Sequence, residues 1–357
     1  MRVRRSRWGE KIVERIIRIV ALSTITLITL IFLFIAREAL GILSSSDSPH
    51  LLPVPHEAAP EIYGGEGNAG AAPEVYNPEA EFPEVPMGAR SPAPQPGNGE
   101  AHPGLLQNLL STVWQPVASQ PKYGLLPLIA GTLKITVLAL LIAAPLGILA
   151  AIYAAFFAPR RFRELIKPVV ELLAGFPSVV IGFFCLMVVA SIVQETIGTT
   201  YRLNALVGGF GLALAILPII FTITEDSFAN LPRYLWEAGL AVGARPWQVV
   251  LYIMVPAATP GIFAALLLGF GRAFGETMIV LMASGNAPLL SWSPLEPVRT
   301  MSATIGAEMG EVVWGSLHYS ILFLIGVLLF VVTFLLNIVA EFWVRQRLLR
   351  RFRGIIS

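Results

Sequence analysis

Seven long apolar runs alternate with short charged segments along the chain. None of these runs contains Asp, Glu, Lys or Arg, and a helix needs about 20 mostly apolar residues to cross the hydrocarbon of a membrane. The runs cover residues 19–36, 135–159, 172–194, 203–224, 246–271, 277–295 and 312–340. Their length and spacing predict an all-α integral membrane protein.

The number of spans depends on the fifth and sixth runs, because only Arg272-Ala-Phe-Gly-Glu276 separates them. Short loops rich in lysine and arginine stay on the cytoplasmic side of a membrane. Seven basic residues precede the first run and five follow the last, so we expect both termini in the cytoplasm and an even number of spans. We therefore predict six transmembrane helices, the fifth of which carries two charges.

Composition supports the membrane class and excludes several others. Of the 357 residues, 55% are hydrophobic and 13% are charged, whereas soluble domains are about 25% charged. A soluble enzyme, a nucleic-acid binder and a disordered scaffold are thereby excluded. The single cysteine, Cys185, cannot form an internal disulfide or a cysteine-based metal site. None of the four lysines follows a glycine, so the chain has no GxxxxGK phosphate loop, and we predict no ATPase site, cofactor or metal of its own.

The charges and prolines divide the chain into four parts. Residues 1–36 form a basic N-terminus with the first helix, and residues 346–357 form a basic cytoplasmic tail. Residues 37–123 hold 14 of the 27 prolines and ten acidic residues, which predicts a largely disordered external segment. This segment is either a tolerated insertion or a docking segment for a partner or the cell wall. Residues 124–345 form a five-helix core with a cytoplasmic loop at 225–255.

Two residues stand out in the second and third spans. Lys134 lies within reach of the outer interface and is expected to extend its ammonium group there. Pro177 removes a backbone donor from the third span, which a membrane tolerates only where neighbouring groups satisfy the freed carbonyl. We consider two roles for Pro177, a packing kink and a hinge or gate.

The loop at 232–247 has the signals of a short helix. Pro232 is suited to its first turn, and Gly243 can end it in the left-handed conformation. The helix between them carries small and apolar residues on the cytoplasmic face. It is either an interfacial helix or one that docks into a groove on another protein.

The fifth span carries the residues that are most costly to place in a membrane. A charge at mid-depth costs about 2.5–3.5 kcal/mol or more, so Arg272 and Glu276 must pair or face a polar cavity. Their spacing of four places them on one face of a continuous helix. Gly271 and Gly275 form a GxxxG pair that allows another helix to approach closely. The charges either lock two helices together or line a path for an anion or a proton.

Several of these stretches resemble a known family. Glu237-Ala238-Gly239 followed by Gly243 resembles the EAA loop of ABC importer permeases, although the third position is usually alanine in that family. Gly271-Arg-Ala-Phe-Gly-Glu-Thr-Met278 is more specific and resembles the phosphate ABC transporter permeases of the PstC type. The resemblance covers roughly residues 105–345, and Trp114-Gln-Pro116 and Thr300-Met-Ser-Ala-Thr304 stand in the family's order.

The resemblance implies a type I ABC importer permease fold in the cell membrane of a prokaryote. It implies a PstA-type sister permease, a dimer of separate ATPase subunits that use ATP, a substrate-binding protein, and phosphate as the substrate. Glu237, Ala238, Gly239 and Gly243 would couple to the ATPase, and Arg272 and Glu276 would assist translocation. Another oxyanion such as molybdate or sulfate is the nearest alternative. An ion-gradient-driven transporter is a further one, which the EAA-like stretch and the lack of an internal repeat disfavour.

Overall fold

The computed structural model describes residues 26, 29–41, 105–118 and 120–353. The chain divides into two compact units, Met1–Ser45 with Leu105–Ser357, and Ser46–Gly104. All described residues belong to the first unit. Most of the predicted external segment 37–123 lies outside the described residues, so its expected disorder stays a prediction.

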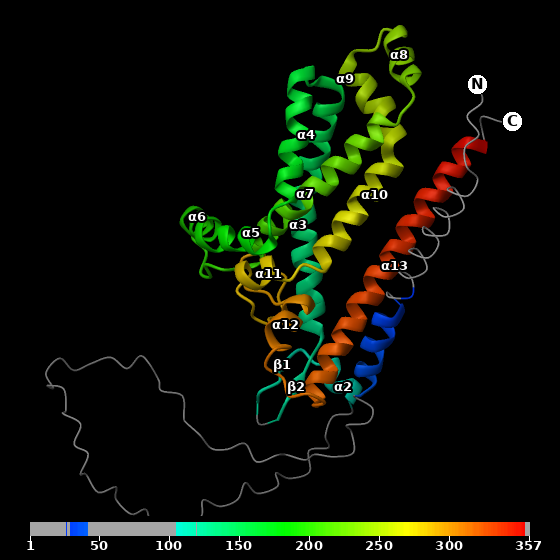
Figure 1. The fold of residues 1–357 in the computed structure, drawn as a ribbon. Helices are drawn as coiled ribbons and strands as arrows, with labels where there is room; N and C mark the ends of the chain where they lie inside the picture. The colour runs from blue at the N-terminus through cyan, green and yellow to red at the C-terminus, as the bar shows by residue number, and fades with distance from the viewer. Residues whose placement is uncertain (1–25, 27–28, 42–104, 119, 354–357) are drawn as a thin grey trace, which may run out of the picture. The chain divides into compact units, whose positions relative to one another are not determined.

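The first unit is almost entirely helical (Figure 1). In chain order its named elements are α2 (Leu105–Leu109), β1 (Trp114–Gln115), β2 (Lys122–Tyr123), α3 (Leu126–Ile152), η2 (Tyr153–Phe157), α4 (Arg160–Ala174), α5 (Ser178–Phe184), η3 (Cys185–Val189), α6 (Ala190–Ile197), α7 (Ala205–Ala229), α8 (Arg233–Ala241), α9 (Pro246–Val249), η4 (Val250–Met254), α10 (Val255–Phe274), α11 (Met278–Ala283), α12 (Met301–Glu308) and α13 (Leu317–Arg353). The segments labelled η are π-helical.

Helices α3, α7 and α10 form the centre of this unit and lie side by side (Figure 1). Asn204 caps α7, because its side-chain oxygen accepts a hydrogen bond from the Val207 backbone N–H at 3.0 Å. Small residues bring the three helices close, and a Cβ atom at Gly147 or Gly269 would lie 3.0 Å from the Ile220 side chain. The core between them is aliphatic and includes Ile135, Ala139, Ala143, Leu212, Ile216 and Ile220.

The outward face of α3 carries an exposed apolar stripe. Leu133, Val137 and Leu141 are exposed and follow one another at intervals of four residues, and Leu149 continues the stripe. Residues four apart share a helix face. The unit therefore presents α3 to lipid or to another protein, as expected of a membrane span.

Five of the described helices are long and apolar enough to cross a membrane, at Leu126–Phe157, Ser178–Ile197, Ala205–Ala229, Pro246–Phe274 and Leu317–Val339. The run 277–295 forms only the six-residue helix α11, so it adds no seventh span. The predicted first span is described from residue 29, where residues 29–41 are helical. The Phe32 ring contacts the Phe330 ring in a tilted arrangement and the Phe34 ring meets the Phe323 ring edge to face, so this helix lies along α13 (Figure 1). The six-span count and the side of each terminus stay predictions.

A short β-hairpin accompanies the helices, and the sequence did not indicate it. Strands β1 and β2 pair Trp114 with Tyr123 and Gln115 with Lys122. The two aromatic side chains are buried and pack in one cluster with Ile321 and Leu322 of α13 and with the first turn of α3. Hydrophobic contact with the helices therefore holds the hairpin in place.

Pro177 separates two helices. Helix α4 ends at Ala174, and Pro177, with φ −58° and ψ 136°, immediately precedes α5. The chain changes direction at this point (Figure 1). The interpretation of residues 172–194 as one kinked span is therefore wrong, because the helix stops before the proline; whether Pro177 acts as a hinge stays a prediction.

Candidate functional site

The fifth span is interrupted where it carries its charges. Helix α10 ends at Phe274, Gly275 has φ −94° and ψ 0°, and α11 begins only at Met278. The break lies between the apolar runs 246–271 and 277–295. Non-helical backbone at membrane depth is tolerated only where protein buries it or where it lines a water-filled cavity. The interrupted backbone by itself therefore makes the break a candidate functional site.

Arg272 and Glu276 do not form the expected helical pair. The prediction that they share one helical face is wrong, because Glu276 lies beyond the end of α10. Arg272 is exposed and Glu276 is half-buried, and among the described residues neither side chain has an ion-pair partner. Within this part of the chain the charges lock no helices together. Their proposed part in translocation stays a prediction.

Within the described part of the chain, no neighbouring side chain packs against Gly271 and Gly275, the two glycines beside these charges. A Cβ atom at Gly271 would meet nothing within 4 Å, and one at Gly275 would meet only the Gly271 carbonyl oxygen, at 3.9 Å. Leu268, one turn before Arg272, is exposed as well. No helix among the described residues packs on this GxxxG pair. A close approach there requires another protein chain, so the predicted packing role stays untested.

Contacts from α12 fix the position of the break. Ser302 Oγ donates to the Glu276 backbone carbonyl at 2.7 Å, and the Glu276 N–H donates to the Ala273 carbonyl at 3.3 Å. A Cβ atom at Gly306 would lie 2.5 Å from the Thr277 side chain, so α12 passes very close to the break. The interruption is therefore held by tertiary contacts to the backbone of Glu276 and to the side chain of Thr277.

The segment after α11, residues 284–300, is tied to the first turns of α3 and α7. The Ala205 and Leu206 N–H groups donate to the carbonyls of Glu296 and Pro294, and Ser284 Oγ donates to the Val298 carbonyl. Lys134 is buried, and its Nζ donates to the Ser293 carbonyl at 3.0 Å. The ammonium group of Lys134 therefore holds this segment, and its expected position at the outer interface stays a prediction.

A cluster around Glu308 was missed by sequence reasoning. The Glu308 carboxylate accepts a hydrogen bond from Trp114 Nε1 at 3.1 Å and pairs with Arg299 Nη1 at 2.7 Å and His318 Nε2 at 2.9 Å. Arg299 Nε also donates to Asn286 Oδ1 at 3.1 Å. One carboxylate thus joins β1, the 284–300 segment, α12 and the first turn of α13. The sequence offered one signal for this cluster: Arg299 directly precedes the Thr300-Met-Ser-Ala-Thr304 stretch that stands in the family's order.

The cluster shifts the acidity of two of its members. Burial raises the pKa of Glu308, but the hydrogen bonds from His318 and Trp114 and the charge of Arg299 outweigh that effect, so the pKa lies below its ordinary value. Burial, and then the negative charge of Glu308, raise the pKa of Tyr123. Glu308 is therefore a carboxylate, and Tyr123 a neutral phenol, at neutral pH.

The expected helix in the 232–247 loop is confirmed. Helix α8 spans Arg233–Ala241 with Pro232 at its N-cap, and Gly243 follows with φ +84°. The Gly243 and Ala244 N–H groups donate to the carbonyls of Leu240 and Gly239, which closes the last turn. Glu237 and Ala238 are exposed on this helix. Their role in coupling stays a prediction.

Gly239 is the buried position of α8. A Cβ atom there would lie 2.9 Å from both Ile253 Cδ1 and Val249 Cγ2, a distance that side chains avoid. The glycine lets α8 lie directly on α9 and η4. The missing methyl group at this position, which is usually alanine in the family that the loop resembles, therefore sets how closely α8 packs.

Comparisons with known proteins match most of the region that contains these features. Residues 143–350 match the family described as "Binding-protein-dependent transport system inner membrane component". A probable ABC transporter permease of Bacillus subtilis, YqgH, is 39% identical over 242 residues, which cover 68% of this chain and 78% of the relative. The phosphate transport system permease proteins PstC of Mesorhizobium japonicum and Haemophilus influenzae are 38% and 32% identical, over 66% and 67% of this chain and 76% and 80% of the relatives.

Solved structures give weaker matches. A bacterial ABC transporter involved in the import of the acidic polysaccharide alginate matches with a TM-score of 0.48 and 16% identity, over 68% of this chain and 87% of its own. The MetNI methionine ABC transporter in an inward-facing conformation matches with a TM-score of 0.47 and 18% identity, over 62% of this chain and 92% of its own.

Proposed function

Because the chain belongs to the family of binding-protein-dependent transport system inner membrane components, we propose that it is the permease subunit of an ATP-driven importer of inorganic phosphate. The helical fold with several apolar spans agrees with a multi-pass membrane protein. The observation that carries the proposal is the interrupted α10, whose charged break falls in the stretch that resembles phosphate permeases.

The relatives support phosphate as the substrate. Proteins named phosphate transport system permease protein match about two thirds of this chain at 32–38% identity. The Gly271–Met278 stretch, on which the resemblance to this family rested, forms the break itself. Phosphate specificity is therefore proposed for this part of the molecule.

Arg272 is the residue that we propose to contact the substrate. Its guanidinium group is exposed beside an uncovered stretch of backbone, and it presents several donors in the planar arrangement that suits phosphate oxygens. Since the surrounding α10 surface has no protein cover among the described residues, a sister permease on the opposite side would complete a path between the two subunits. Phosphate would exchange part of its hydration for the Arg272 donors as it passes.

Glu276 balances that attraction in the proposed path. Its backbone is anchored by Ser302, while its carboxylate is half-buried next to the break. A carboxylate near Arg272 offers the guanidinium an alternative partner and repels the phosphate anion. The pair would thus bind phosphate transiently and release it.

Helix α8 is the proposed contact with the ATPase subunits. It is short and joined to the rest of the chain by loops, and Glu237 and Ala238 are exposed on it. A short amphipathic helix of this kind fits a groove on a partner protein. Two ATPase subunits would close on ATP and move α8, so this chain needs no nucleotide site of its own and acts as a transporter subunit without enzymatic activity.

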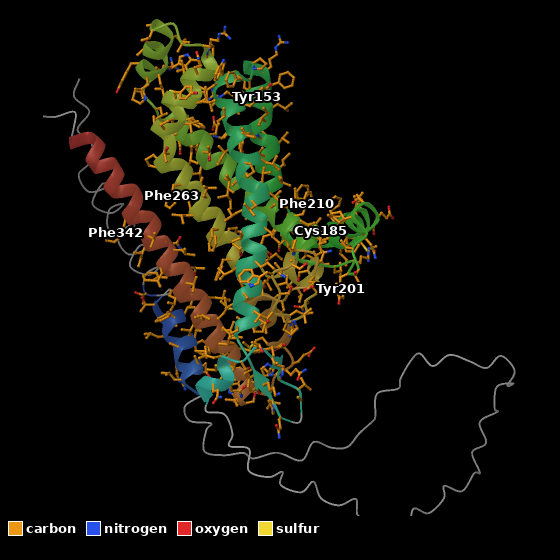
Figure 2. All side chains as sticks on the ribbon, turned by 180° about the vertical axis from the view of Figure 1, so that it is seen from behind. Tyr153, Cys185, Tyr201, Phe210, Phe263 and Phe342 are labelled. Atoms are coloured by element: carbon orange, nitrogen blue, oxygen red, sulfur yellow. The ribbon has the colours of Figure 1, made fainter. Side chains whose placement is uncertain are left out.

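The residues around α8 favour the cytoplasmic face for that end of the unit. Exposed aromatic side chains occur at Tyr153, Trp247 and Tyr252, and Figure 2 shows Tyr153 where α3 passes into η2, near the α8 end. Arg233 and Arg245 lie on the same stretch. Aromatic belts mark membrane interfaces and basic residues mark the inner one. We therefore place α8 inside the cell and the Glu308 cluster outside, where a phosphate-binding protein would dock.

Competition for uptake tests the substrate class. The complex of this chain, its sister permease, the ATPase pair and the binding protein is reconstituted into vesicles with ATP, and labelled phosphate uptake is measured. Excess arsenate should suppress uptake, because it has the charge and shape of phosphate, and sulfate or molybdate should not. Uptake of sulfate or molybdate in place of phosphate would assign the complex to another oxyanion.

A further inference from the structure

A buried carboxylate fastens α4 to the end of α7 that leads into α8. Only 8% of the Glu225 side chain is exposed. Arg163 Nη2 donates to one carboxylate oxygen at 3.1 Å and Lys167 Nζ to the other at 3.2 Å. Arg163 and Lys167 are four residues apart and share one face of α4. Because each oxygen has its own cation, the contact restrains both the distance and the rotation of α4.

The neighbouring carboxylate offers a natural contrast. Asp226 also pairs with Lys167, at 3.2 Å, but 54% of its side chain is exposed. The hydrogen bonds of Lys167 to Glu225 and then to Asp226 raise the pKa of the lysine. Exposed ion pairs contribute little to stability. The buried carboxylate of Glu225, in contrast, needs cationic partners, so it is the important acid of this cluster.

Aromatic rings continue from this cluster to α8. Phe228, one turn after Glu225, is buried and meets the Phe156 ring edge to face at 5.2 Å between centroids. Phe156 in turn stacks on Trp236 of α8 at 5.3 Å with an interplanar angle of 12°. Contacts therefore connect α4, the end of α7, η2 and α8 without a gap.

Two contacts hold helix α8 against the helical unit, and a hollow lies beside one of them. One is the Trp236 ring on Phe156, and the other is the backbone of Gly239 against Ile253. A cavity of about 520 Å³ lies beside the first contact, and its lining includes Phe156 and Trp236 together with Arg163 and Glu237. The inner face of α8 is thus not packed along its whole length, which leaves room for displacement.

Both contact points fall on π-helical segments. Phe156 belongs to η2 and Ile253 to η4. Such segments interrupt the regular i→i−4 hydrogen bonding of a helix and are sites of bending. A displacement of α8 therefore reaches the central helices at the points where their backbones are least regular.

We infer that Glu225 and Phe156 are positioning residues for energy coupling, which pass the movement of α8 to α4 and to the central helices. The inference rests on the proposed function, since it assumes that α8 receives the movement of the ATPase. Glu225 supplies the rigid junction between α4 and α7, and Phe156 supplies the contact between that junction and α8. In the proposed mechanism both residues act through α8 and α4, and neither is assigned a contact with phosphate or ATP.

The test measures phosphate transported per ATP hydrolysed by the reconstituted complex. Glu225→Gln keeps the shape of the side chain and removes its charge, and Phe156→Leu removes both ring contacts and keeps an apolar side chain. Each should lower the ratio about fivefold or more, while ATP hydrolysis and co-purification of the subunits persist. Asp226→Asn, which alters an exposed partner of the same lysine, and Glu195→Gln, an exposed acid on α6, should leave the ratio unchanged.

Each outcome decides between the possibilities. A lowered ratio in both variants, with no further loss when they are combined, supports one shared connection. Transport and hydrolysis that fall in the same proportion show a merely structural role and overturn the inference, as does an unchanged ratio in assembled complexes. If Glu225→Gln fails to assemble, Phe156→Leu decides alone. A wild-type complex that imports no phosphate overturns the proposed function, whereas an active wild type with unchanged variants overturns only the inference.

Discussion

Glu308 and Arg272 show two uses of a charge in an apolar protein. Glu308 is surrounded by three donors from three different segments, and 14% of its side chain is exposed. Arg272 is exposed beside an interrupted helix and has no ion-pair partner among the described residues. A fully satisfied charge fixes structure, whereas an unsatisfied one is available to a ligand or to another subunit.

The unsatisfied charge leads to a prediction for transport. Arg272→Gln should abolish phosphate uptake, because the amide lacks the charge and the paired donors that suit phosphate. Arg272→Lys should retain part of the uptake, since it keeps the charge without the planar geometry. Uptake and ATP hydrolysis are measured in the same reconstituted vesicles, and hydrolysis should continue in both variants. Normal uptake by assembled Arg272→Gln would remove Arg272 from the path.

The satisfied charge leads to a prediction for stability. Glu308→Gln leaves Arg299 without its carboxylate in a site where about 15% of the arginine side chain is exposed, so it should lower the free energy of unfolding by about 3 kcal/mol. The melting temperature of the purified protein measures the loss. Glu311→Gln, a change in an acid that is exposed three residues later, serves as the matched control and should have little effect.

The same variant should change how stability depends on pH. The pKa of Glu308 is lower in the folded state than its ordinary value of 4.5, so its contribution is complete above that value and is lost as the pH falls through the folded-state pKa. The difference in melting temperature between wild type and Glu308→Gln should thus be constant near neutral pH and shrink in acid below pH 4.5. A difference that grows on acidification would contradict this assignment.

At the scale of elements, α8 depends on the conformation of a single residue. Gly243 has φ +84°, and a Cβ atom there would meet nothing within 4 Å. The backbone conformation, and not a lack of space, therefore limits which residues fit at this position. Gly243→Val should distort the end of α8, because β-branched residues strongly disfavour this region. Gly243→Asn is the matched control, because asparagine tolerates it.

The expected result is a loss of coupling. Gly243→Val should lower uptake several-fold relative to ATP hydrolysis or weaken co-purification with the ATPase, whereas Gly243→Asn should behave like wild type in both measurements. Two normal results in Gly243→Val would contradict this role: full phosphate uptake, and ATP hydrolysis that the binding protein stimulates as in wild type. Together they would show that the end of α8 does not take part in coupling.

Local signals explain why α8 was predictable and α10 was not. Pro232 and Gly243 lie in sequence next to the helix that they delimit, and the structure confirms both. Helix α10 ends between two apolar runs, in the short charged segment that was predicted to lie inside one continuous span. The break is fixed by Ser302 and Gly306 of α12, and apolar periodicity does not reveal such distant contacts.

Sequence separation also explains the missed cluster at Glu308. Trp114 donates to it from 194 positions away, and the strand that holds Trp114 has only two residues. Neither periodicity nor motif spacing brings such residues together. The apolar runs, in contrast, predicted long membrane helices, because span length depends on composition along the chain alone. Five such helices are found among the described residues, and the sixth predicted span is described only in part.

At the scale of the whole molecule, two of the exposed surfaces among the described residues differ in their chemistry. The α10 surface around Gly271 and Leu268 is uncovered, and α3 presents its apolar stripe outward. Hydrocarbon can cover the leucines and valines of α3, but it cannot satisfy the charge of Arg272. The proposed function accounts for this difference with a polar path between α10 and a second subunit, and with lipid over the α3 stripe.

Energy-dependent uptake tests the central claim most directly. Labelled phosphate accumulation is followed in vesicles that contain the complete complex, with binding protein outside and ATP inside. The proposed function predicts accumulation that requires ATP and the binding protein and that stops when a non-hydrolysable analogue replaces ATP. Accumulation driven by an ion gradient in vesicles without ATP and without the ATPase, or no accumulation of phosphate at all, would contradict it.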